Sequence, residues 1–452
     1  MSALARYLNT SGYNISGSDK EQSTLIKDLQ YEGIKNIWIP HSRKNIQDIC
    51  PDLIIYSTAI ENSNEEFIWA KENKKEILHR ASLLELITDS KKLISISGTH
   101  GKTTTSGMIS EMLLSSDLNP SIILGGILES RNTNSIFGSS DYFVIEADES
   151  DKSFLKGNPE ISVITNIESD HLENYPGGLE EIKASFLDFA KKAISKKGLV
   201  ICMQDKITDE LIRKNFSLND PKLISYGINT DSSEITIKAN LNNKTKLWDV
   251  YLKQNLLFTL KLKTPGNHNV LNALAAVGVG YLIGISPEKI KNALEKHQGI
   301  KRRFQILVKT SEITIVDDYA HHPTEIIATI KAAKELCPKR LIIVFQPHQP
   351  RRLQDCWNAF IGAFKEEDSP VFITDLYIAR GCEIKGISSQ KLVQDINKPN
   401  VNYLSGNIEE ITKHLSVLTK KGDFILIMGA GNITNLGPML MKTCKEFREQ
   451  LI

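Results

Sequence analysis

The sequence predicts an α/β protein that divides into three domains. Its 452 residues are more than one hydrophobic core usually supports. Short apolar runs alternate with helical patterns along most of the chain, which is typical of parallel sheets covered by helices. Residues 234–263 instead alternate polar and apolar side chains, which indicates antiparallel strands. We therefore expect domains at 1–90, 91–305 and 306–452.

The first domain is expected to be part of a Rossmann-type unit, with strands at 13–16, 36–39 and 53–57 separated by helical or turn segments. The second domain should contain a mixed sheet, because its parallel strands are followed by the alternating stretch and then by a helix at 270–282. The parallel strands of the second domain are expected at 93–97, 142–147, 162–166, 199–203 and 223–226.

The third domain is expected to be a second Rossmann-like α/β sheet, with strands at 313–317, 341–345, 371–374 and 424–428. Gly429 and Gly431 directly follow the last of these strands. A dinucleotide-binding fingerprint would have a third glycine and would open its domain rather than close it. The two glycines therefore predict a tight strand-to-helix turn.

The composition excludes several classes of function. The formal charge of +1 shows none of the basic surface that binding to nucleic acid requires. No apolar run approaches the roughly 20 residues of a membrane helix, and no signal peptide opens the chain. The six cysteines lack any Cys-x-x-Cys spacing, which fits reduced thiols and argues against zinc. We expect a cytoplasmic protein without nucleic-acid partners or membrane insertion; the oligomeric state is left open.

Residues 98–105, with the sequence GTHGKTTT, follow the apolar strand at 93–97 and predict a phosphate-binding loop. Two glycines let backbone N–H groups turn towards an anion, Lys102 supplies a positive charge and Thr103 a hydroxyl for magnesium. Ile96 stands where the common P-loop pattern has its first glycine, so this loop is a shorter variant. A helix cap without a ligand is disfavoured, because a strand precedes the loop and a helical pattern follows it. We expect a P-loop ATPase-type domain that binds ATP.

Acidic and histidine side chains follow two further strands of the same domain. Glu146 ends the strand at 142–147, and His171 lies just beyond the strand at 162–166. Ligands of open α/β sheets bind at the carboxyl ends of the strands, so Glu146 can reach a magnesium ion held by Thr103. His171 would lie at the same edge and could serve a second cation, although histidine is an unusual ligand for Mg2+. The alternative, a solvated acidic loop, is disfavoured by this position.

Six motifs together resemble the Mur ligase family of peptidoglycan synthesis. They occur in the family's order and across all three predicted domains: Gly-Thr-His-Gly-Lys-Thr at 98–103, Glu-Ala-Asp-Glu-Ser-Asp at 146–151, Thr-Asn-Ile-Glu-x-Asp-His at 165–171, His-Asn-x-x-Asn at 268–272, Arg-Arg-Phe at 302–304 and Asp-Asp-Tyr-Ala-His-His-Pro-Thr-Glu at 317–325. The last motif is most similar to the family member that joins L-alanine to UDP-N-acetylmuramate.

The resemblance implies an ATP-driven amide synthesis that needs Mg2+. The lactyl carboxylate of UDP-N-acetylmuramate would take the γ-phosphate to form an acyl phosphate, and the amine of L-alanine would then displace phosphate. Residues 1–90 would bind the UDP-sugar, 91–305 ATP and 306–452 the amino acid. The implied magnesium ligands are Thr103, Glu146 and His171.

The implied catalytic residues are Lys102, Glu146, His171, Arg303, His321 and Arg352. Arg352 would pair with the carboxylate of alanine. The implied nucleotide-binding residues are Gly98, Thr99, His100, Gly101, Lys102, Thr103, Thr104, Asn269, Asn272, Arg303 and Asp318. Taken singly, the asparagines could be helix caps and the arginines solvated side chains.

Two departures from the family pattern concern substrate binding. Several relatives carry an arginine directly after Phe-Gln-Pro-His, where this chain has Gln349. Relatives also have a strand and a glycine-rich loop before the first helix, whereas this chain begins at Met1 within that region. The missing backbone N–H groups would hold the UDP pyrophosphate. We therefore expect the first domain to be incomplete and the native start to lie upstream.

Two other functions remain open. The first is a recycling ligase of the same family, which joins an intact peptide to UDP-N-acetylmuramate. The sequence of residues 317–325 instead favours the alanine-adding enzyme. The second is an ATP-binding regulatory module without turnover. A guanine-specific switch is disfavoured because the sequence lacks Asn-Lys-x-Asp.

Overall fold

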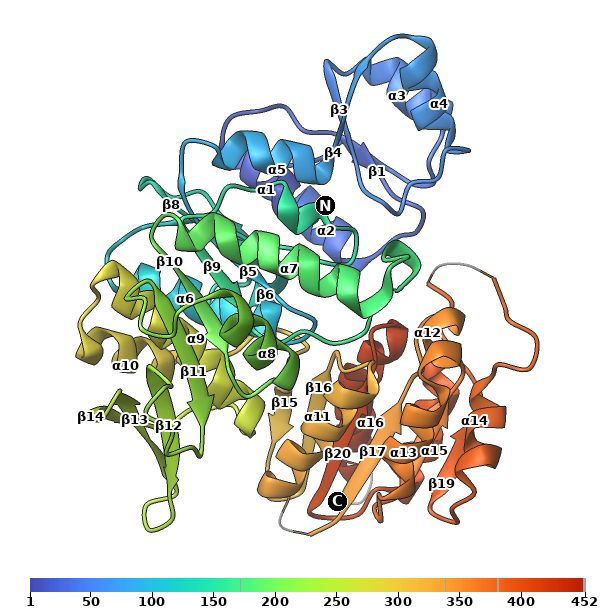
Figure 1. Cartoon of the computed structure of the whole chain (residues 1–452). Helices are drawn as coiled ribbons and strands as arrows, with labels where there is room; N and C mark the ends of the chain where they lie inside the picture. Colours follow the sequence, from blue (N-terminus) through green and yellow to red (C-terminus); the bar gives the residue numbers. More distant parts are fainter. Residues whose placement is uncertain (171, 338, 380–381, 450–452) are drawn as a thin grey trace. The chain divides into compact units, whose positions relative to one another are not determined.

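A computed structural model describes residues 1–170, 172–337, 339–379 and 382–449 (Figure 1). The chain forms two compact units. The first unit comprises Met1–Leu262 and Val270–His297, and the second comprises Lys263–Asn269 and Gln298–Ile452. The chain changes unit after Leu262, after Asn269 and after His297, and the second of these changes lies within helix α9 (Asn267–Ile283).

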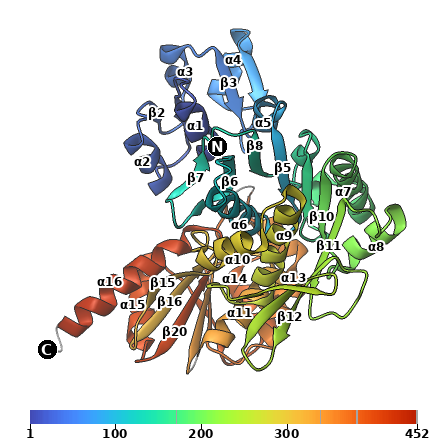
Figure 2. The same cartoon turned by 90° about the vertical axis from the view of Figure 1, so that its left-hand side faces the viewer.

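The N-terminal part of the first unit carries two separate pairs of parallel strands, which Figure 2 shows with their helices. The strands are β1 (Gly17–Ser18), β2 (Ile37–Trp38), β3 (Leu53–Tyr56) and β4 (Glu76–His79). The helices are α1 (Ser2–Thr10), α2 (Thr24–Tyr31), α3 (Arg43–Ile49), α4 (Glu65–Glu72) and α5 (Arg80–Thr88). Side-chain oxygens of Ser23, Ser42 and Asn64 cap α2, α3 and α4, which explains where these helices begin.

The strand expected at 13–16 is wrong, because these residues adopt no regular secondary structure. Backbone pairing starts only at Gly17, which lies opposite Ile37. Gly12 has a positive φ of 92°, and Tyr13 is 64% exposed. The chain therefore leaves α1 through a turn, and its first strand begins at Gly17, just after the predicted strand ends.

The central sheet of the first unit is mixed, as predicted. Among the described residues it has ten strands in the order β14-β13-β12-β11-β10-β9-β5-β8-β6-β7. Neighbours from β12 to β6 pair in parallel, whereas β12-β13, β13-β14 and β6-β7 pair antiparallel. The strands are β5 (Lys92–Ser97), β6 (Ser121–Leu128), β7 (Thr133–Ile136), β8 (Tyr142–Glu146), β9 (Ile161–Ile164), β10 (Gly198–Cys202), β11 (Leu223–Ile228), β12 (Ile237–Asn242), β13 (Leu247–Leu252) and β14 (Asn255–Leu260).

Helices cover both faces of this sheet (Figure 2). On one face, Leu199 and Ile201 of β10 pack with Phe186 of α7. On the other, Gly278 of α9 approaches so closely that a Cβ there would lie 2.7 Å from Val200 Cγ1. β10 is therefore buried on both sides, which explains its continuous apolar sequence. The helical segments are α6 (Lys102–Ser115), α7 (Gly178–Ile194), α8 (Lys206–Asn215) and α10 (Pro287–Lys296), with short 3-10 turns η1 (Ser153–Leu155) and η2 (Leu172–Asn174).

The second unit contains an α/β sheet in the order β15-β16-β20-β17-β18-β19. All neighbours are parallel except β15 and β16. The strands are β15 (Gln305–Lys309), β16 (Ile313–Asp318), β17 (Leu341–Phe345), β18 (Val371–Thr374), β19 (Val401–Leu404) and β20 (Asp423–Met428). The helical segments are α11 (Pro323–Leu336), α12 (Pro350–Asp355), α13 (Trp357–Lys365), α14 (Ser389–Ile396), α15 (Ile408–Leu418), η3 (Asn432–Asn435) and α16 (Leu436–Glu449).

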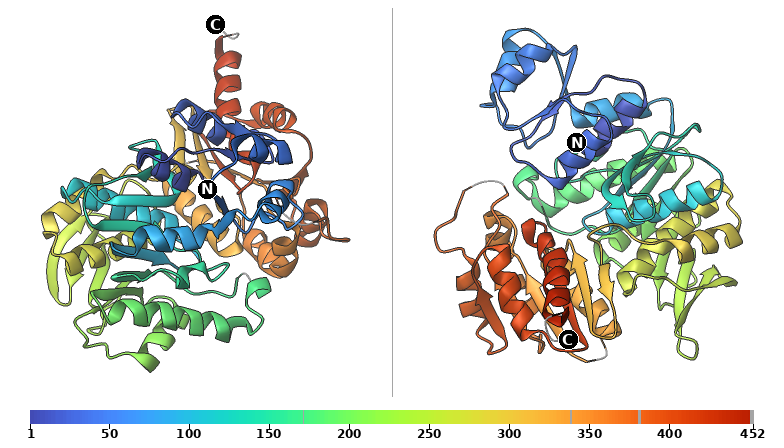
Figure 3. Two further views of the ribbon diagram at one scale, coloured as in Figure 1. Left: turned by 90° about the horizontal axis from the view of Figure 1, so that it is seen from above. Right: turned by 180° about the vertical axis from the view of Figure 1, so that it is seen from behind.

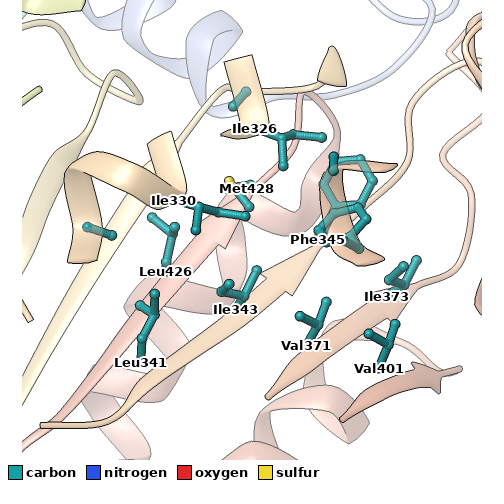
Figure 4. Close-up of a cluster of buried hydrophobic side chains, with 14 of the residues drawn as sticks. Ile326, Ile330, Leu341, Ile343, Phe345, Val371, Ile373, Val401, Leu426 and Met428 are labelled. Atoms are coloured by element: carbon teal, nitrogen blue, oxygen red, sulfur yellow. The ribbon is translucent and has the colours of Figure 1, made fainter. Parts of the chain in front are cut away.

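Two apolar cores lie on opposite faces of this second sheet. Ile343 and Phe345 point to the face covered by α11, α13 and α14, where Figure 4 shows them beside Ile326 and Ile330. Alternate residues such as Ile342 face α15 and α16, which lie in front of the strands in the right-hand view of Figure 3. The four strands predicted here are confirmed, and the turn predicted after β20 leads into η3.

Candidate active site

The phosphate loop of the first unit connects β5 to α6 and depends on both of its glycines. Gly98 has φ +135°, and a Cβ there would lie 2.1 Å from Thr165 Oγ1. Gly101 has φ +83°, and a Cβ there would lie 2.6 Å from Asn272 Oδ1. L-residues rarely adopt such φ values, and neither position has room for a side chain. The sequence forms this loop because glycine stands at both positions.

The segment that follows β9 holds the loop in place. Asn166 accepts the backbone N–H of His100 at 2.8 Å through Oδ1, and its Nδ2 donates to the carbonyl of His100 at 2.9 Å. Thr165 Oγ1 donates to the same carbonyl at 2.6 Å. The backbone N–H of Glu168 donates to Thr99 Oγ1 at 2.8 Å. These bonds to backbone groups hold the loop in one shape.

These anchoring roles were not predicted. The motif at 165–171 was expected to act through His171, which lies outside the described residues. A signal was present in the sequence, because Thr165 and Asn166 directly follow β9, the parallel neighbour of β5. Adjacent parallel strands end at the same edge of a sheet, so residues just after β9 meet the loop just after β5.

Lys102 begins α6 and its ammonium group folds back onto the loop. Nζ donates to the carbonyl oxygens of Gly98 at 2.6 Å and Thr99 at 3.1 Å, and to Glu149 Oε1 at 2.9 Å. Burial lowers the pKa of Lys102. The carboxylates of Glu149, Asp148 and Glu146 raise it by more than burial lowers it, so the pKa lies above its usual value. Lys102 therefore carries its charge at neutral pH.

Glu146 lies at the carboxyl end of β8, in register with Ile96 of β5. The backbone N–H of Gly125 donates to Glu146 Oε2 at 3.0 Å and orients the carboxylate. Thr103 is buried in the first turn of α6, followed by the partly buried Thr104. Hydroxyl and carboxylate oxygens are the donors that Mg2+ prefers, so Thr103 and Glu146 fit this cation.

The two asparagines at the start of α9 are both buried, 4% exposed for Asn269 and 6% for Asn272. In the first unit, Thr105 Oγ1 donates to Asn272 Oδ1 at 3.1 Å, which ties α9 to α6. In the second unit, Asn269 Nδ2 donates to the carbonyl of Pro265 at 2.7 Å. Asn272 therefore lies beside the phosphate loop, against Gly101.

In the second unit, Asp318 ends β16 and organises two segments of backbone. Its carboxylate accepts the N–H of Phe304 at 2.6 Å and the N–H of Ala320 at 2.7 Å. Burial raises the pKa of Asp318 to about 6, although Arg303 and the two N–H groups lower it. The structure gives Asp318 a backbone-bracing position next to the predicted Arg303.

Arg302 and Arg303 both lie over the ring of Tyr319, with guanidinium carbons 4.8 and 4.9 Å from its centroid. Arg302 Nη2 donates to the carbonyl of Gly429 at 2.7 Å. Arg303 Nη1 lies 3.9 Å from Glu325 Oε1. Cation–π contacts with a partly buried ring hold guanidinium groups in place. Tyr319 and Glu325 are thus site residues to which the sequence analysis assigned no role.

His321 lies in a group of aromatic side chains. Its ring centroid is 5.6 Å from that of His348, which stacks on Tyr377 at 5.9 Å. Burial lowers the pKa of His321 to about 4, although the Glu325 carboxylate raises it; the charge of Arg352 lowers it further. His321 is therefore neutral at pH 7, and Arg352 lies close enough to act on it electrostatically.

Gln349, where the resemblance led us to note an arginine in several relatives, directly precedes α12 and has a φ of 64°. Its backbone N–H donates to the carbonyl of Tyr377 at 3.0 Å. The backbone here is thus tied to the segment that carries the His348 and Tyr377 rings.

Of the helices in the described ranges, none combines the length and the apolar character needed to cross a bilayer.

The chain matches three family models in succession. Residues 1–92 match "Mur ligase family, catalytic domain", residues 96–280 match "Mur ligase middle domain", and residues 302–431 match "Mur ligase, glutamate ligase domain".

Individual relatives agree over the full length. A UDP-N-acetylmuramate–L-alanine ligase of Clostridium novyi is 40% identical, over 98% of this chain and 95% of that protein. The crystal structure of the UDP-N-acetylmuramate–alanine ligase of Thermotoga maritima superposes with a TM-score of 0.82 at 27% identity, covering 99% of this chain and 97% of that one. A murein peptide ligase of Psychrobacter arcticus, with a TM-score of 0.72 at 22% identity over 98% of this chain and 96% of that one, shares the fold. This chain belongs to the Mur ligase family.

Proposed function

We propose that this protein is an ATP-dependent ligase that joins L-alanine to the lactyl carboxylate of UDP-N-acetylmuramate in peptidoglycan synthesis. The reaction passes through an acyl phosphate and gives ADP and phosphate. The observation that carries the proposal is the 40% identity, over nearly the whole chain, with a ligase of that name. The pre-shaped phosphate loop with its charged lysine supports it independently. We place the reaction in the cytoplasm.

The nucleotide site lies around the phosphate loop of the first unit. Gly98, Thr99, His100, Gly101 and Thr104 line the phosphates, and Asn269 and Asn272 contact adenine. Thr103 and Glu146 hold Mg2+, together with His171 from outside the described residues. When bound, Mg2+ neutralises charge on the phosphate oxygens. Asp318 keeps Arg303 in position through the backbone of Phe304.

Lys102 and Arg303 supply the positive charge that a transferred phosphoryl group requires. Phosphoryl transfer needs little covalent chemistry from the protein, so positioning and charge neutralisation carry most of the catalysis. A carboxylate is a poor electrophile until it becomes an acyl phosphate. The loop anchored by Thr165 and Asn166 fixes the attacked phosphate.

The amino acid binds in the second unit, and the UDP-sugar binds to residues 1–90. Arg352 pairs with the carboxylate of alanine, which suits the planar guanidinium group. His321 is neutral at pH 7 and therefore does not repel the alanine ammonium. The half-buried rings of His321, His348 and Tyr377 restrict the access of water, which protects the acyl phosphate from hydrolysis.

The direct test is phosphate release from Mg-ATP with UDP-N-acetylmuramate and L-alanine, leaving out each component in turn. We expect release only with all of them. A parallel reaction with a tripeptide in place of alanine distinguishes the recycling ligase. Release without either acceptor, or faster release with the tripeptide, would contradict the proposal.

ATP binding without turnover under every condition would favour a regulatory module.

A further inference from the structure

The carboxylate of Glu149 forms a close ion pair with Lys102. Its Oε1 and Oε2 atoms both lie 2.9 Å from Nζ. Glu149 is 5% exposed, and the Lys102 side chain is 15% exposed. Two opposite charges at this distance and burial interact strongly, and neither has easy access to water.

The protein holds Glu149 in this position from its backbone. The hydroxyl of Tyr175 donates to the carbonyl of Glu149, and the N–H of Lys152 donates to it at 3.1 Å. The N–H groups of Ser150 and Phe154 donate to Asp148, the residue before it. The loop after β8 is therefore fixed on both sides of Glu149. This fixed backbone directs the Glu149 carboxylate towards Lys102 of the phosphate loop.

Among the described residues, three groups accept from the ammonium group, one for each of its N–H donors. Two of them, the carbonyl oxygens of Gly98 and Thr99, belong to the phosphate loop itself. The third, Glu149, belongs to a different segment and is the only one of the three with a negative charge. A phosphate that binds Lys102 must replace one acceptor, and a carboxylate beside a polyphosphate is the one that charge repulsion disfavours.

We propose that Glu149 is a positioning residue that holds Lys102 in the nucleotide-free enzyme, and that a nucleoside di- or triphosphate binds by exchanging this carboxylate for phosphate oxygens. The inference rests on the proposed function, because it takes the ATP site as given. It assigns to Glu149 a competition with the nucleotide, which a merely structural residue lacks.

The ionisation of Glu149 supports the same inference. Burial raises the pKa of Glu149 to about 7, although Lys102 lowers it. The charge of Asp148 also raises the pKa of Glu149. Burial raises the pKa of Tyr175, and the carboxylates of Glu149, Asp148, Asp151 and Glu181 raise it further. The charge of Glu146 acts on the same ammonium group. His100 of the phosphate loop has its Nε2 atom 3.5 Å from Glu168 Oε2. Glu149 therefore changes charge in the neutral range, and only its ionised form competes fully with phosphate.

The first experiment compares Mg-ADP binding by the wild type and Glu149→Gln, using calorimetry on the full chain at pH 8. We expect the variant to bind ADP about three- to tenfold more tightly, because the competing charge is absent. Removal of a merely structural residue would weaken binding instead. Unchanged or weaker binding by a folded variant would overturn the inference.

Glu181→Gln is the matched control. Glu181 pairs with Lys152 and accepts the N–H of Gly177, in the same region but without contact to Lys102. We expect its ADP affinity to equal that of the wild type. A gain equal to that of Glu149→Gln would show a general effect of lost negative charge and would overturn the inference. No ADP binding by the wild type itself would overturn the proposed nucleotide site, a result distinct from both.

A second measurement needs only the wild type and covers the case in which Glu149→Gln fails to fold. Phosphate groups are already ionised above pH 7, since their second pKa is about 6. As the pH rises from 7 to 8.5, Glu149 loses its remaining protons and competes more strongly. We expect the dissociation constant of ADP to rise about threefold over this range. A constant affinity would contradict the exchange.

Discussion

The backbone N–H of Gly125 donates a hydrogen bond of 3.0 Å to Glu146 Oε2, and no side chain fits between them. A Cβ at Gly125 would lie 2.6 Å from Oε2 and 3.0 Å from Cδ of Glu146. Gly125 lies in β6 and Glu146 ends β8, its parallel neighbour. A carboxylate predicted to hold Mg2+ is thus oriented by the neighbouring strand through close approach of the backbone.

Gly125→Ala should therefore impair the reaction through Glu146. The added methyl group must displace the carboxylate, and displacement of a catalytic group by about 1 Å can cost on the order of 100-fold in rate. We expect phosphate release to fall by at least about tenfold, with half-maximal activity at a higher Mg2+ concentration. Titration of activity with Mg2+ measures both.

Gly362→Ala is the control for that substitution. Gly362 lies within α13, and an added Cβ would meet nothing within 4 Å. Alanine favours helices over glycine by about 1 kcal/mol, so stability should stay equal or rise while activity is unchanged. Full activity of Gly125→Ala would show that the hydrogen bond to Glu146 has no catalytic consequence.

Gly101→Ala should weaken nucleotide binding. Two effects act together: a φ of +83° disfavours alanine, and the new Cβ would lie 2.6 Å from Asn272 Oδ1. Gly284→Ala separates them, because Gly284 has nearly the same φ, +82°, with nothing within 4 Å. Both variants should lose about 1 kcal/mol of stability.

The KM for ATP should rise only in Gly101→Ala, by about tenfold, since displacement of Asn272 removes an adenine contact. Steady-state kinetics with varied ATP give the value. An equal KM in the two glycine variants would contradict the role assigned to Asn272.

The sequence predicted best the elements that are buried on both faces. β17 and β20 are nearly unbroken apolar runs, and β5 combines apolar residues with the buried serines Ser95 and Ser97. Such buried runs between turns have few alternatives. β1 has only two residues, too short for any periodic pattern, whereas the strand predicted at 36–39 contains the equally short β2. β4 and β19 were missed because each begins or continues with exposed polar residues, and β6 because Gly125 and Gly126 interrupt it.

In the candidate site, the sequence predicted those residues whose side-chain chemistry and local motif together indicate a role. Lys102 and Thr103 follow from the loop, and Glu146 follows from its place at the end of a strand. Which carboxylate of 146–149 faces Lys102 depends on the turn after β8, and that turn is set by Tyr175 and Phe154. Thr165 and Asn166 act on backbone atoms of another segment, a contact that only the pairing of β5 and β9 creates.

Arg340→Met should destabilise the second unit. Arg340 donates to both carboxylate oxygens of Asp423, which is 3% exposed at the start of β20. Loss of the arginine leaves a buried carboxylate without its cation, which typically costs about 3–5 kcal/mol. Because Arg340 is itself 36% exposed, we expect a smaller loss of about 2–3 kcal/mol.

Hydrogen exchange of the amides of β17 and β20 measures this loss locally. Arg351→Met is the control, because Arg351 and its partner Asp355 are 72% and 45% exposed. That pair should contribute less than about 1 kcal/mol. Equal losses in the two variants would show that burial of Asp423 does not matter.

His268 should make the second unit less stable in acid. Burial lowers the pKa of His268 to about 4, although Glu325 raises it. Between pH 6.5 and 4 the unfolded chain therefore binds a proton that the folded chain does not, so unfolding is favoured as the pH falls. Between pH 7 and pH 5 this single residue should lower the free energy of unfolding by about 2 kcal/mol. The loss is about 1.36 kcal/mol for each pH unit below its unfolded pKa of about 6.5.

His268→Gln removes this dependence while keeping a polar side chain of similar size. Hydrogen exchange at pH 7 and pH 5 measures the free energy of opening of the β16 and β17 amides. Its decrease between the two pH values should be about 2 kcal/mol smaller in the variant than in the wild type. Asp318 acts in the opposite direction, because burial raises its pKa to about 6 and protonation then favours the folded state. The difference between variant and wild type cancels that contribution, so an unchanged pH dependence in His268→Gln would mean that His268 is protonated as readily in the folded chain as in the unfolded one.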